Sequence, residues 1–461
     1  MRGIFFKICF ISAILCSQSP DINYHLHLYS INRLSDGGVI KIPFRLADID
    51  FNHQNDNISV TSRLSFEYKP KFSDFYLQTS SSEEFSVDLR ELYLTWYLND
   101  LELNIGKQIH TWGSVDQNSP LDNAGPYDYY YIFNTGTDQK MGSLSSSLNY
   151  YSDNNTLGFV FSPIHHTNRL PIGDDDFPIE LPVVPGPELI KNVDNEIELG
   201  AYIKHSFDKG DINLSYYSGN DRVYNLSGVN VFTNEQETIY SNIDTVFTYR
   251  RCEVIGVGGT FITDPYIFRF DYGLFHTFDP NSDVRRDRPD KQDGTVLANN
   301  WHHILATHAF EEEVYYNQAA FQIEYSNNSN QFVLGFFEYH ISEYNANYLA
   351  AVDIPGVEAD VDPKDYFYPG LGAPIAILTE KALMYQFQKE LKDIVFTAKG
   401  VNDLNDKGYL IELGLIHSIS DDMKIHSYIN KVFGDSSKDE DYRFNQMEDF
   451  SHFRLELEYY F

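Results

Sequence analysis

Two long polar stretches carry most of the side chains that could bind a metal ion or exchange protons. Residues 164–187 include His165, His166 and three consecutive aspartates at 174–176, and residues 299–308 include three histidines. Clustered carboxylates are ligands that Ca²⁺ prefers. Neither stretch, however, has the spacing of an EF-hand loop or the HExxH spacing of a zinc protease, and spacing selects no Ser/His/Asp combination. We therefore expect no metal site, no cofactor and no catalytic residues, and we interpret both stretches as solvated loops.

The elements that must position these stretches are β-strands with one apolar face. In HFRLELEYYF (residues 452–461), every second residue from Phe453 to Phe461 is apolar, while Arg454, Glu456 and Glu458 alternate with them. In LYLTWYLNDLELNIG (residues 92–106), a two-residue turn keeps the apolar stripe continuous across a hairpin. Similar pairs surround short polar turns near 152–155, 208–210, 264–265, 327–330 and 420–422.

The start of the chain has the layout of a secretory signal peptide. Arg2 and Lys7 precede an apolar run that ends at Leu15, and small polar residues follow. We expect residues 1–19 to be removed and residues 20–461 to form one domain. No later stretch approaches the 18 uninterrupted apolar residues of a transmembrane helix.

The composition suits a secreted chain whose strands cross a membrane. Mean hydropathy is −0.37, yet the chain contains 34 Tyr and 34 Phe. In a transmembrane barrel, apolar and polar residues alternate along each strand, so the hydropathy averaged over a sequence window stays low. A low mean hydropathy is therefore compatible with a high aromatic content. A secreted soluble all-β domain is the alternative. The net charge of −33 makes nucleic acid an unfavourable partner.

Short turns and long connections alternate along the chain. The long ones are near 109–141, 164–195, 219–245, 278–312, 342–380 and 434–449. This alternation is typical of outer-membrane barrels, in which short turns face the periplasm and long loops face the cell surface. We predict an all-β fold, a transmembrane antiparallel β-barrel of about 18 strands in the outer membrane of a Gram-negative bacterium, with 16 strands as the alternative.

The predicted strands are 22–33, 39–50, 57–69, 86–98, 101–111, 142–151, 156–163, 196–207, 211–218, 247–263, 266–277, 313–326, 331–341, 381–389, 393–400, 408–418, 423–433 and 450–461. Residues 244–263 are interpreted as one long strand that rises above the membrane. In the second strand, Ile40, Ile42 and Phe44 are expected to face lipid.

The polar faces of these strands must then meet water inside the barrel. Eighteen strands enclose more space than side chains can fill. Charges of both signs across a narrow aqueous pore favour small hydrated polar solutes over apolar ones. The residues predicted to line the pore are Arg45, Arg63, Glu67, Glu91, Gln108, Arg269, Asp271, Glu324, Arg454 and Glu456.

The stretch GKQIHTWGSVDQNSPLD (residues 106–122) is predicted to narrow that pore. A glycine-bounded aromatic residue that leaves a strand suits a segment that folds back into the lumen. We expect this role for residues 112–133, in particular for Trp112, Asp116, Asp122, Tyr127 and Tyr130. The alternative for Trp112 is a place in the aromatic belt at the membrane interface.

The same stretch resembles a motif of a widespread family of porin-like Gram-negative outer-membrane barrels, mostly of unknown function and related to alginate-export-type porins. The matching residues are Gly106, Lys107, Gln108, Trp112, Gly113, Asp116, Asn118, Pro120, Leu121 and Asp122. Residues 89–106 and 249–261 fit the same family, although Lys107 replaces the more usual arginine. The resemblance implies a barrel that acts as a channel.

These observations predict a porin or channel for passive or facilitated diffusion of small hydrophilic solutes, and not an enzyme. A surface adhesin or structural barrel is the alternative, and an outer-membrane enzyme is a further one. The expected partners are membrane lipid, lipopolysaccharide bridged to the acidic loops through divalent ions, and the barrel-assembly machinery, which would bind the C-terminal strand. The identity of the solute, the ion selectivity and the oligomeric state stay open.

Overall fold

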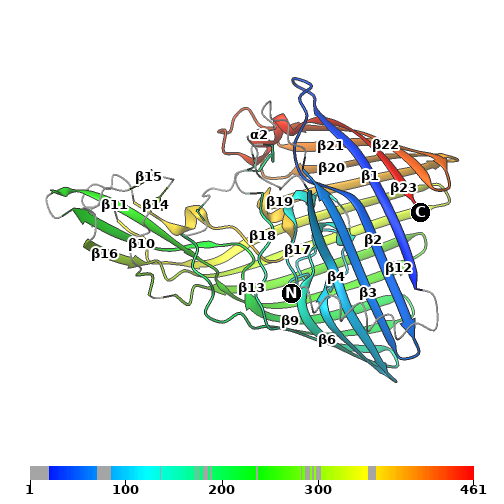
Figure 1. Ribbon diagram of the computed structural model, residues 1–461, viewed down its shortest axis with the longest axis horizontal. Coiled ribbons are helices and arrows are strands. Elements are labelled where there is room, and N and C mark those ends of the chain that lie inside the picture. Colours follow the sequence, from blue (N-terminus) through cyan, green and yellow to red (C-terminus); the bar gives the residue numbers. More distant parts are fainter. Residues whose placement is uncertain are drawn as a thin grey trace.

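The chain folds into one closed β-barrel with a smaller sheet beyond one end (Figure 1). The computed structural model describes residues 20–461 except 70–84, 135, 172–173, 175, 180–184, 187–188, 235–236, 282, 286–290, 293–294, 297–302 and 351–359. The predicted signal peptide, residues 1–19, lies outside the described residues. Eighteen antiparallel strands form the wall, which confirms the larger of the two predicted strand numbers.

The wall strands follow one another around the barrel in chain order. They are β1 (Asp21–Arg33), β2 (Phe44–Asn55), β3 (Ile58–Tyr68), β4 (Phe85–Leu98), β5 (Leu101–Gln108), β6 (Ser143–Ser152), β7 (Asn155–Ser162), β8 (Glu198–Phe207), β9 (Gly210–Asn220), β12 (Arg251–Thr263), β13 (Tyr266–Phe278), β17 (Glu313–Asn327), β18 (Asn330–Asn345), β19 (Lys381–Leu391), β20 (Ile394–Asp403), β21 (Tyr409–Ser420), β22 (Met423–Phe433) and β23 (His452–Tyr460).

Two further sheets and several short helices lie in the long connections. The strands are β10 (Asn225–Asn234), β11 (Glu237–Thr248), β14 (Lys291–Gln292), β15 (Thr295–Val296) and β16 (His303–Ala309). The helices are η1 (Tyr129–Tyr131), η2 (Gly136–Gln139), η5 (Pro363–Tyr366), η6 (Pro374–Ile377), α2 (Arg443–Gln446) and η7 (Met447–Phe450). Among the residues that the structure describes, no helix is both long and apolar enough to cross a membrane.

All the short turns lie at one end of the barrel and have the same length. Two residues join the strands of each of the eight hairpins there, from Asp56–Asn57 to Asp421–Asp422. The first turn residue has a positive φ at Asp56, Asn99, Asp153 and Lys392. This is the backbone of the tight turns that match the twist of paired strands. Because consecutive wall strands are antiparallel, successive connections alternate between the two ends, and the long connections all lie at the other end, as predicted.

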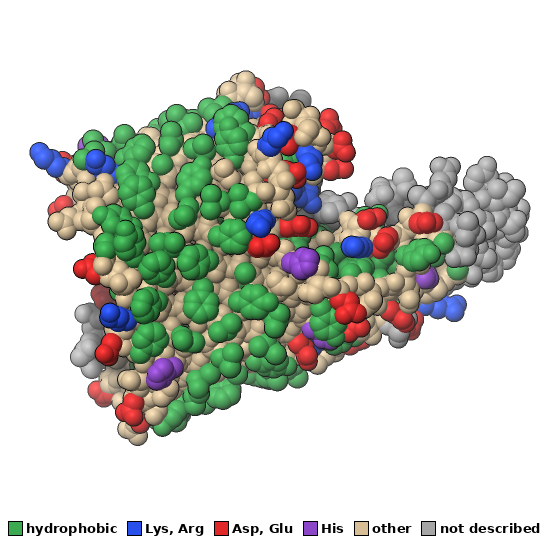
Figure 2. All heavy atoms as spheres, turned by 180° about the vertical axis from the view of Figure 1, so that it is seen from behind, with side chains coloured by type: hydrophobic (Ala, Val, Ile, Leu, Met, Phe, Trp, Pro, Cys, Tyr) green, Lys and Arg blue, Asp and Glu red, His purple; other side chains and the backbone are tan. Residues whose placement is uncertain are grey.

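The barrel closes between its first and last strands. β1 pairs with β23 in antiparallel register from His25–Tyr460 to Arg33–His452. The outward residues of β23 are apolar, and Leu455 is 47% exposed. Figure 2 shows hydrophobic side chains over much of the wall's outer surface. A closed sheet leaves no edge with unpaired backbone groups, and an apolar exterior suits contact with lipid.

Two predictions about strands are wrong. The second strand starts at Phe44 rather than at residue 39, and Ile40, Ile42 and Phe44 are buried instead of facing lipid. A β-bulge between Arg45 and Ala47, where the β2–β3 register shifts, breaks strict alternation there.

Residues 244–263 form two strands rather than one. β11 ends at Thr248, and β12 begins at Arg251. β11 pairs with β10, which pairs with β16, in a separate three-stranded sheet beyond the long-connection end of the barrel (Figure 1). The connections predicted at 219–245 and 278–312 therefore contain strands.

Candidate functional site: the segment across the lumen

The connection between β5 and β6 crosses the inside of the barrel. Asp116 contacts Arg269 on β13, and Asn118 Nδ2 donates a hydrogen bond to Sδ of Met384 on β19 (3.4 Å). Around the wall, eight strands separate β5 from β19 in either direction. β19 therefore lies opposite β5, and a contact between the two sides can only be made through the interior.

The segment begins at a tight turn that Asp122 closes. Its Oδ1 accepts hydrogen bonds from the backbone N–H groups of Trp112 (2.6 Å) and Gly113 (2.9 Å), and its Oδ2 forms an ion pair with Lys140. The carboxylate thus holds together the two ends of an eleven-residue loop, residues 112–122. The sequence motif includes Asp122, but it did not predict that this carboxylate would close the loop.

Trp112 packs against the wall rather than lying in open space. Its ring centroid is 5.7 Å from that of Tyr202, and a Cβ built on Gly200 would lie 2.1 Å from the indole. Glycine at position 200 is therefore required for this close approach. Asn213 Nδ2 also donates to the Trp112 carbonyl (2.8 Å).

Asp271 fixes the middle of the segment to β13. Its carboxylate accepts hydrogen bonds from the backbone N–H groups of Ser114 and Val115 (2.9 Å each to Oδ2) and from the Ser119 hydroxyl (2.8 Å). Asp271 is only 1% exposed. A buried carboxylate with several donors is stable only while those donors stay in place, so Asp271 and the segment depend on each other.

Asp116 extends the attachment to the neighbouring strand. Its Oδ2 accepts a hydrogen bond from Gln322 Nε2 (2.7 Å), and Gln322 Oε1 accepts one from the Asp116 N–H (3.2 Å). Arg269 lies 3.3 Å from Asp116 and 2.9 Å from Glu324. Asp116 remains more than half exposed, so it is a charge that a passing solute can meet.

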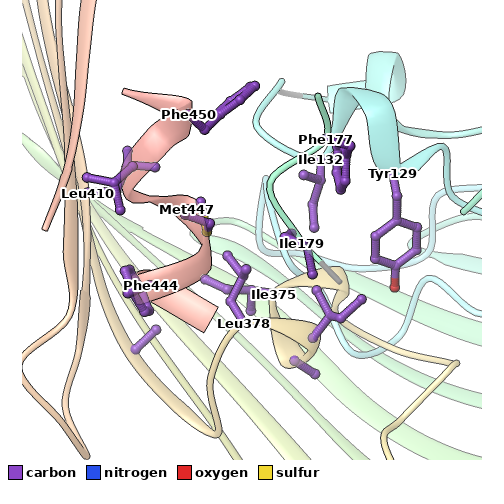
Figure 3. Close-up of a cluster of buried hydrophobic side chains, with 14 of the residues drawn as sticks. Tyr129, Ile132, Phe177, Ile179, Ile375, Leu378, Leu410, Phe444, Met447 and Phe450 are labelled. Atoms are coloured by element: carbon purple, nitrogen blue, oxygen red, sulfur yellow. The ribbon is translucent and has the colours of Figure 1, made fainter. Parts of the chain in front are cut away.

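Five connections meet in one buried apolar cluster that includes Val115 of the segment (Figure 3). Residues from the 34–43, 109–142, 163–197, 346–380 and 434–451 connections contribute to it, together with wall residues such as Leu410. The members labelled in the figure are Tyr129, Ile132, Phe177, Ile179, Ile375, Leu378, Leu410, Phe444, Met447 and Phe450. The cluster fills barrel space that a simple water-filled pore would leave open.

Buried ion pairs hold a further connection, residues 221–250, to a wall strand and to the next long connection along the chain. Arg222 is bidentate to Glu198 on β8 (3.0 and 2.7 Å), and both side chains are almost fully buried. Arg250 lies 3.4 Å from Asp221 and 3.3 Å from Glu312. Removing one partner of such a pair leaves a buried charge, so these contacts keep the connections in place.

Neither arginine could be identified from the strand pattern. Alternation identifies residues on strands, whereas Arg222 and Arg250 lie just outside them. One signal was present: the adjacent Arg250 and Arg251 interrupt the apolar alternation, and the strand boundary lies there.

The residues predicted to line the pore lie in two kinds of surroundings. Glu67, Gln108 and Asp271 are at most 5% exposed and contact the folded-in connections or wall hydroxyls, as when Glu67 binds Arg169 (2.7 Å). Arg45 lies over the Tyr131 ring (3.8 Å), and Glu91 accepts from the Ile109 N–H (3.1 Å).

The remaining predicted residues form contacts within the wall. Arg63 pairs with Asp50 (2.8 Å), Arg269 with Glu324, Glu456 with His27 (3.0 Å), and Arg454 lies over the Tyr428 ring (4.2 Å). Of the predicted constriction residues, Tyr127 is buried in the apolar cluster, and Tyr130 donates to Asp174 (2.7 Å). The role of all these residues in permeation stays a prediction.

Two cavities adjoin the segment. One of about 420 Å³ lies between β2–β8 and residues 108–112, and it is lined mainly by polar side chains such as Asn52, Gln54 and Asn104. The other, of about 270 Å³, lies between β17–β22 and residues 115–118 and 132–133. Their combined lining offers space and polar contacts for small solutes. In the described part of the chain, no group of three or more His, Cys, Asp or Glu side chains is placed to hold a metal ion.

Comparison with solved structures finds other barrels of similar extent. OpdK of Pseudomonas aeruginosa with vanillate is 9% identical, with a TM-score of 0.47, over 96% of this chain and 98% of that one. OccK2 (OpdF) of the same organism is 9% identical, with a TM-score of 0.48, over 96% and 97%. OmpT, an outer membrane protein of Vibrio cholerae, is 10% identical, with a TM-score of 0.41, over 97% and 99%.

No protein-family model and no curated protein matches the sequence. Identities this low carry no information on solute or activity, and the resemblance to alginate-export-type porins stays a prediction. The location follows from the architecture itself. A closed antiparallel barrel of 18 strands with an apolar exterior is a protein of the Gram-negative outer membrane.

Proposed function

We propose that the protein is an outer-membrane channel through which small hydrophilic solutes diffuse, and that residues 112–122 form its constriction. The observation that carries the proposal is the path of this segment, which leaves the wall at β5, is held on β13 through Asp271 and Asp116, and reaches Met384 on the opposite strand β19 through Asn118. A segment held in this way by the inner wall narrows the lumen.

The chemistry of the narrowed space supports selection by size and polarity. Asp116, Arg269 and Glu324 place charges of both signs beside the segment. Opposed charges in a narrow aqueous space favour hydrated polar solutes and disfavour apolar ones. We infer that permeation is slow compared with an open barrel of this size, because the apolar cluster occupies much of the long-connection end.

Swelling of liposomes tests the proposal directly. Vesicles that contain the purified, folded protein should swell in small neutral sugars, and the rate should fall as solute size increases. Vesicles with heat-denatured protein are the control. Swelling no faster than in that control for any solute would contradict a channel and favour a structural barrel.

A surface adhesin is the second candidate, and one observation favours it. The sheet of β10, β11 and β16 lies beyond the barrel and has its own buried residues, including Val229, Val231 and Phe310. A channel does not need such a sheet. Removing residues 229–245 should leave solute swelling intact if the channel is the main function, and should abolish attachment to surfaces if adhesion is.

Three further proposals concern export and assembly. We propose that residues 1–19 direct secretion, that the assembly machinery recognises the alternating β23, and that divalent ions bridge the acidic surface loops to lipopolysaccharide. The support for the second is that β23 alternates apolar and polar residues and closes the barrel by pairing with β1. Deleting Phe461 should lower the amount of assembled barrel in the membrane with little change in its stability. Unchanged assembly would contradict recognition through that residue.

A further inference from the structure

The smaller cavity combines an apolar side with a polar side. Its apolar lining includes Val115, Ile132, Phe133, Ile375 and Leu378 of the folded-in connections, and the wall adds Val333, Met384, Val401 and Leu410. Its polar lining comes largely from the wall and includes Gln386 on β19, Lys399 on β20, Glu412 on β21 and Asn430 on β22. At about 270 Å³, the cavity lies just below the roughly 300–1,000 Å³ of sites for drug-sized ligands, so it suits a smaller molecule.

Several polar side chains around this cavity have no protein partner. Within the described residues, the amides of Gln117, Gln386 and Asn430 make no hydrogen bond to protein, and Asn430 is only 5% exposed. Each such amide offers two donors and one acceptor. Lys399 and Glu412 lie 3.5 Å apart, which is a loose ion pair that a hydroxyl group could join. Hydrogen-bonding capacity is therefore concentrated here and unused.

The larger cavity differs in its apolar content. Asn104 Nδ2 donates to Glu102 (3.0 Å) and Ser147 (3.3 Å), and Gln108 bonds to Ser145 and Ser147, whereas Asn104 Oδ1 has no partner among the described residues. Its lining is mainly polar and lacks the aliphatic group that Ile375 and Leu378 contribute to the smaller cavity. The larger cavity therefore resembles a hydrated passage more than a binding site.

The charge around the smaller cavity disfavours an anion. Among the residues that the structure describes, Asp116 and Glu412 line it together with one cation, Lys399. The nearby Arg269 is already paired with both Asp116 and Glu324. An added carboxylate would meet more negative than positive charge without a free cation to bind it.

We propose that this cavity is a binding site for a neutral monosaccharide or simple glycoside on its way through the channel. A sugar ring has an apolar C–H face, which would lie on Phe133 and the aliphatic side chains, and an edge of hydroxyl groups, which would bond to Gln386, Asn430 and the Lys399–Glu412 pair. The inference rests on the proposed channel function and adds the solute class.

Binding to the folded, detergent-solubilised protein tests the solute class without requiring permeation. Methyl galactopyranoside should bind, as measured by titration calorimetry, and galacturonate, which has the same ring with a carboxylate, should bind at least about tenfold more weakly. Equal affinity for the acid, or no binding of the glycoside at millimolar concentration, would overturn the proposal. This comparison uses the wild-type protein, so misfolding of a variant cannot obscure it.

Two variants locate the site. Gln386→Ala and Asn430→Ala should each weaken glycoside binding about tenfold. Gln54→Ala, which removes an amide from the larger cavity, should leave glycoside binding unchanged. Heat-modifiable migration on gels verifies that each variant is folded. Loss of affinity in Gln54→Ala equal to that in Gln386→Ala would overturn the location.

Current recordings separate failure of this inference from failure of the proposed function. If the protein conducts ions and the glycoside briefly interrupts the current, the channel function and the sugar site are both supported. If it conducts and the glycoside neither binds nor interrupts the current, the sugar site is wrong and the channel stands. If the glycoside binds but no current flows in any salt, the channel is wrong.

Discussion

Asp271 is the residue on which the position of the segment depends most. Its inward direction could be predicted from alternation, but its burial could not, because its donors lie more than 150 positions earlier in the chain. The same holds for Glu67, which was expected to meet water and instead binds Arg169. Alternation predicts on which side of a strand a residue lies. Packing between distant segments decides whether water reaches that side chain.

Replacing Asp271 with alanine should loosen the segment. Two backbone N–H groups and the Ser119 hydroxyl would lose their acceptor, and each buried donor left unpaired costs about 1–3 kcal/mol. Single-channel conductance should therefore rise and become noisier. Asp211→Asn, which alters an ion pair between two wall strands, is the matched control and should leave conductance unchanged. Wild-type conductance in Asp271→Ala would show that the carboxylate does not hold the constriction.

Acidification should weaken the same region through His110. Burial, with smaller contributions from Lys140 and Arg222, lowers the pKa of His110 from 6.5 to about 4. Because the folded pKa lies below the ordinary one, the unfolded chain binds the proton more readily. The contribution of neutral His110 to stability is complete above pH 6.5 and is lost as pH falls towards 4.

Urea unfolding at several pH values measures this contribution. The loss of stability between pH 6.5 and pH 4 should be smaller in His110→Gln, whose side chain does not titrate, than in the wild type. Identical pH dependence of the two proteins would contradict the assignment to His110.

At the scale of elements, the two-residue turns explain why the strand pattern could be predicted so closely. Each turn fixes the register of its hairpin, and a slip by one residue would expose the polar face to lipid. The errors lie at the other end, where no tight turn fixes the register: β2 starts late and contains a bulge just after its first residue, and β11 leaves the barrel. Alternation in β10 and β11 resembles that of the wall, so the sequence pattern alone could not separate the two sheets.

A cation on the outer face of β23 should prevent assembly. Leu455 and Leu457 pair with Ser30 and Leu28 of β1 at the closing seam. Lysine at either position would cost about 2–4 kcal/mol near the bilayer midplane. Leu455→Lys/Leu457→Lys should therefore yield no heat-modifiable barrel, whereas Leu455→Phe, which keeps the face apolar, should assemble normally. Normal assembly of the double lysine variant would mean that this face does not meet lipid.

At the scale of the whole molecule, the barrel is a container whose interior is organised by its connections. The wall could be predicted from local alternation and turn lengths. The interior could not, because it is built from contacts between segments far apart in sequence, such as Asn118 with Ile375 (3.0 Å) and Phe133 with Phe450. The motif at residues 106–122 was the one local signal of that organisation.

The most direct test of this account is the single-channel conductance of a variant in which a short glycine–serine linker replaces residues 112–133. Gln108 and Ser143 pair at the end of the β5–β6 hairpin, so a short connection can close it. A variant without residues 229–245, from the outer sheet, is the control. We expect discrete current steps from the wild type and much larger current steps from the linker variant. The control variant should give current steps of wild-type size. Equal conductance of the first variant and the wild type, or no current from either, would contradict a channel narrowed by this segment.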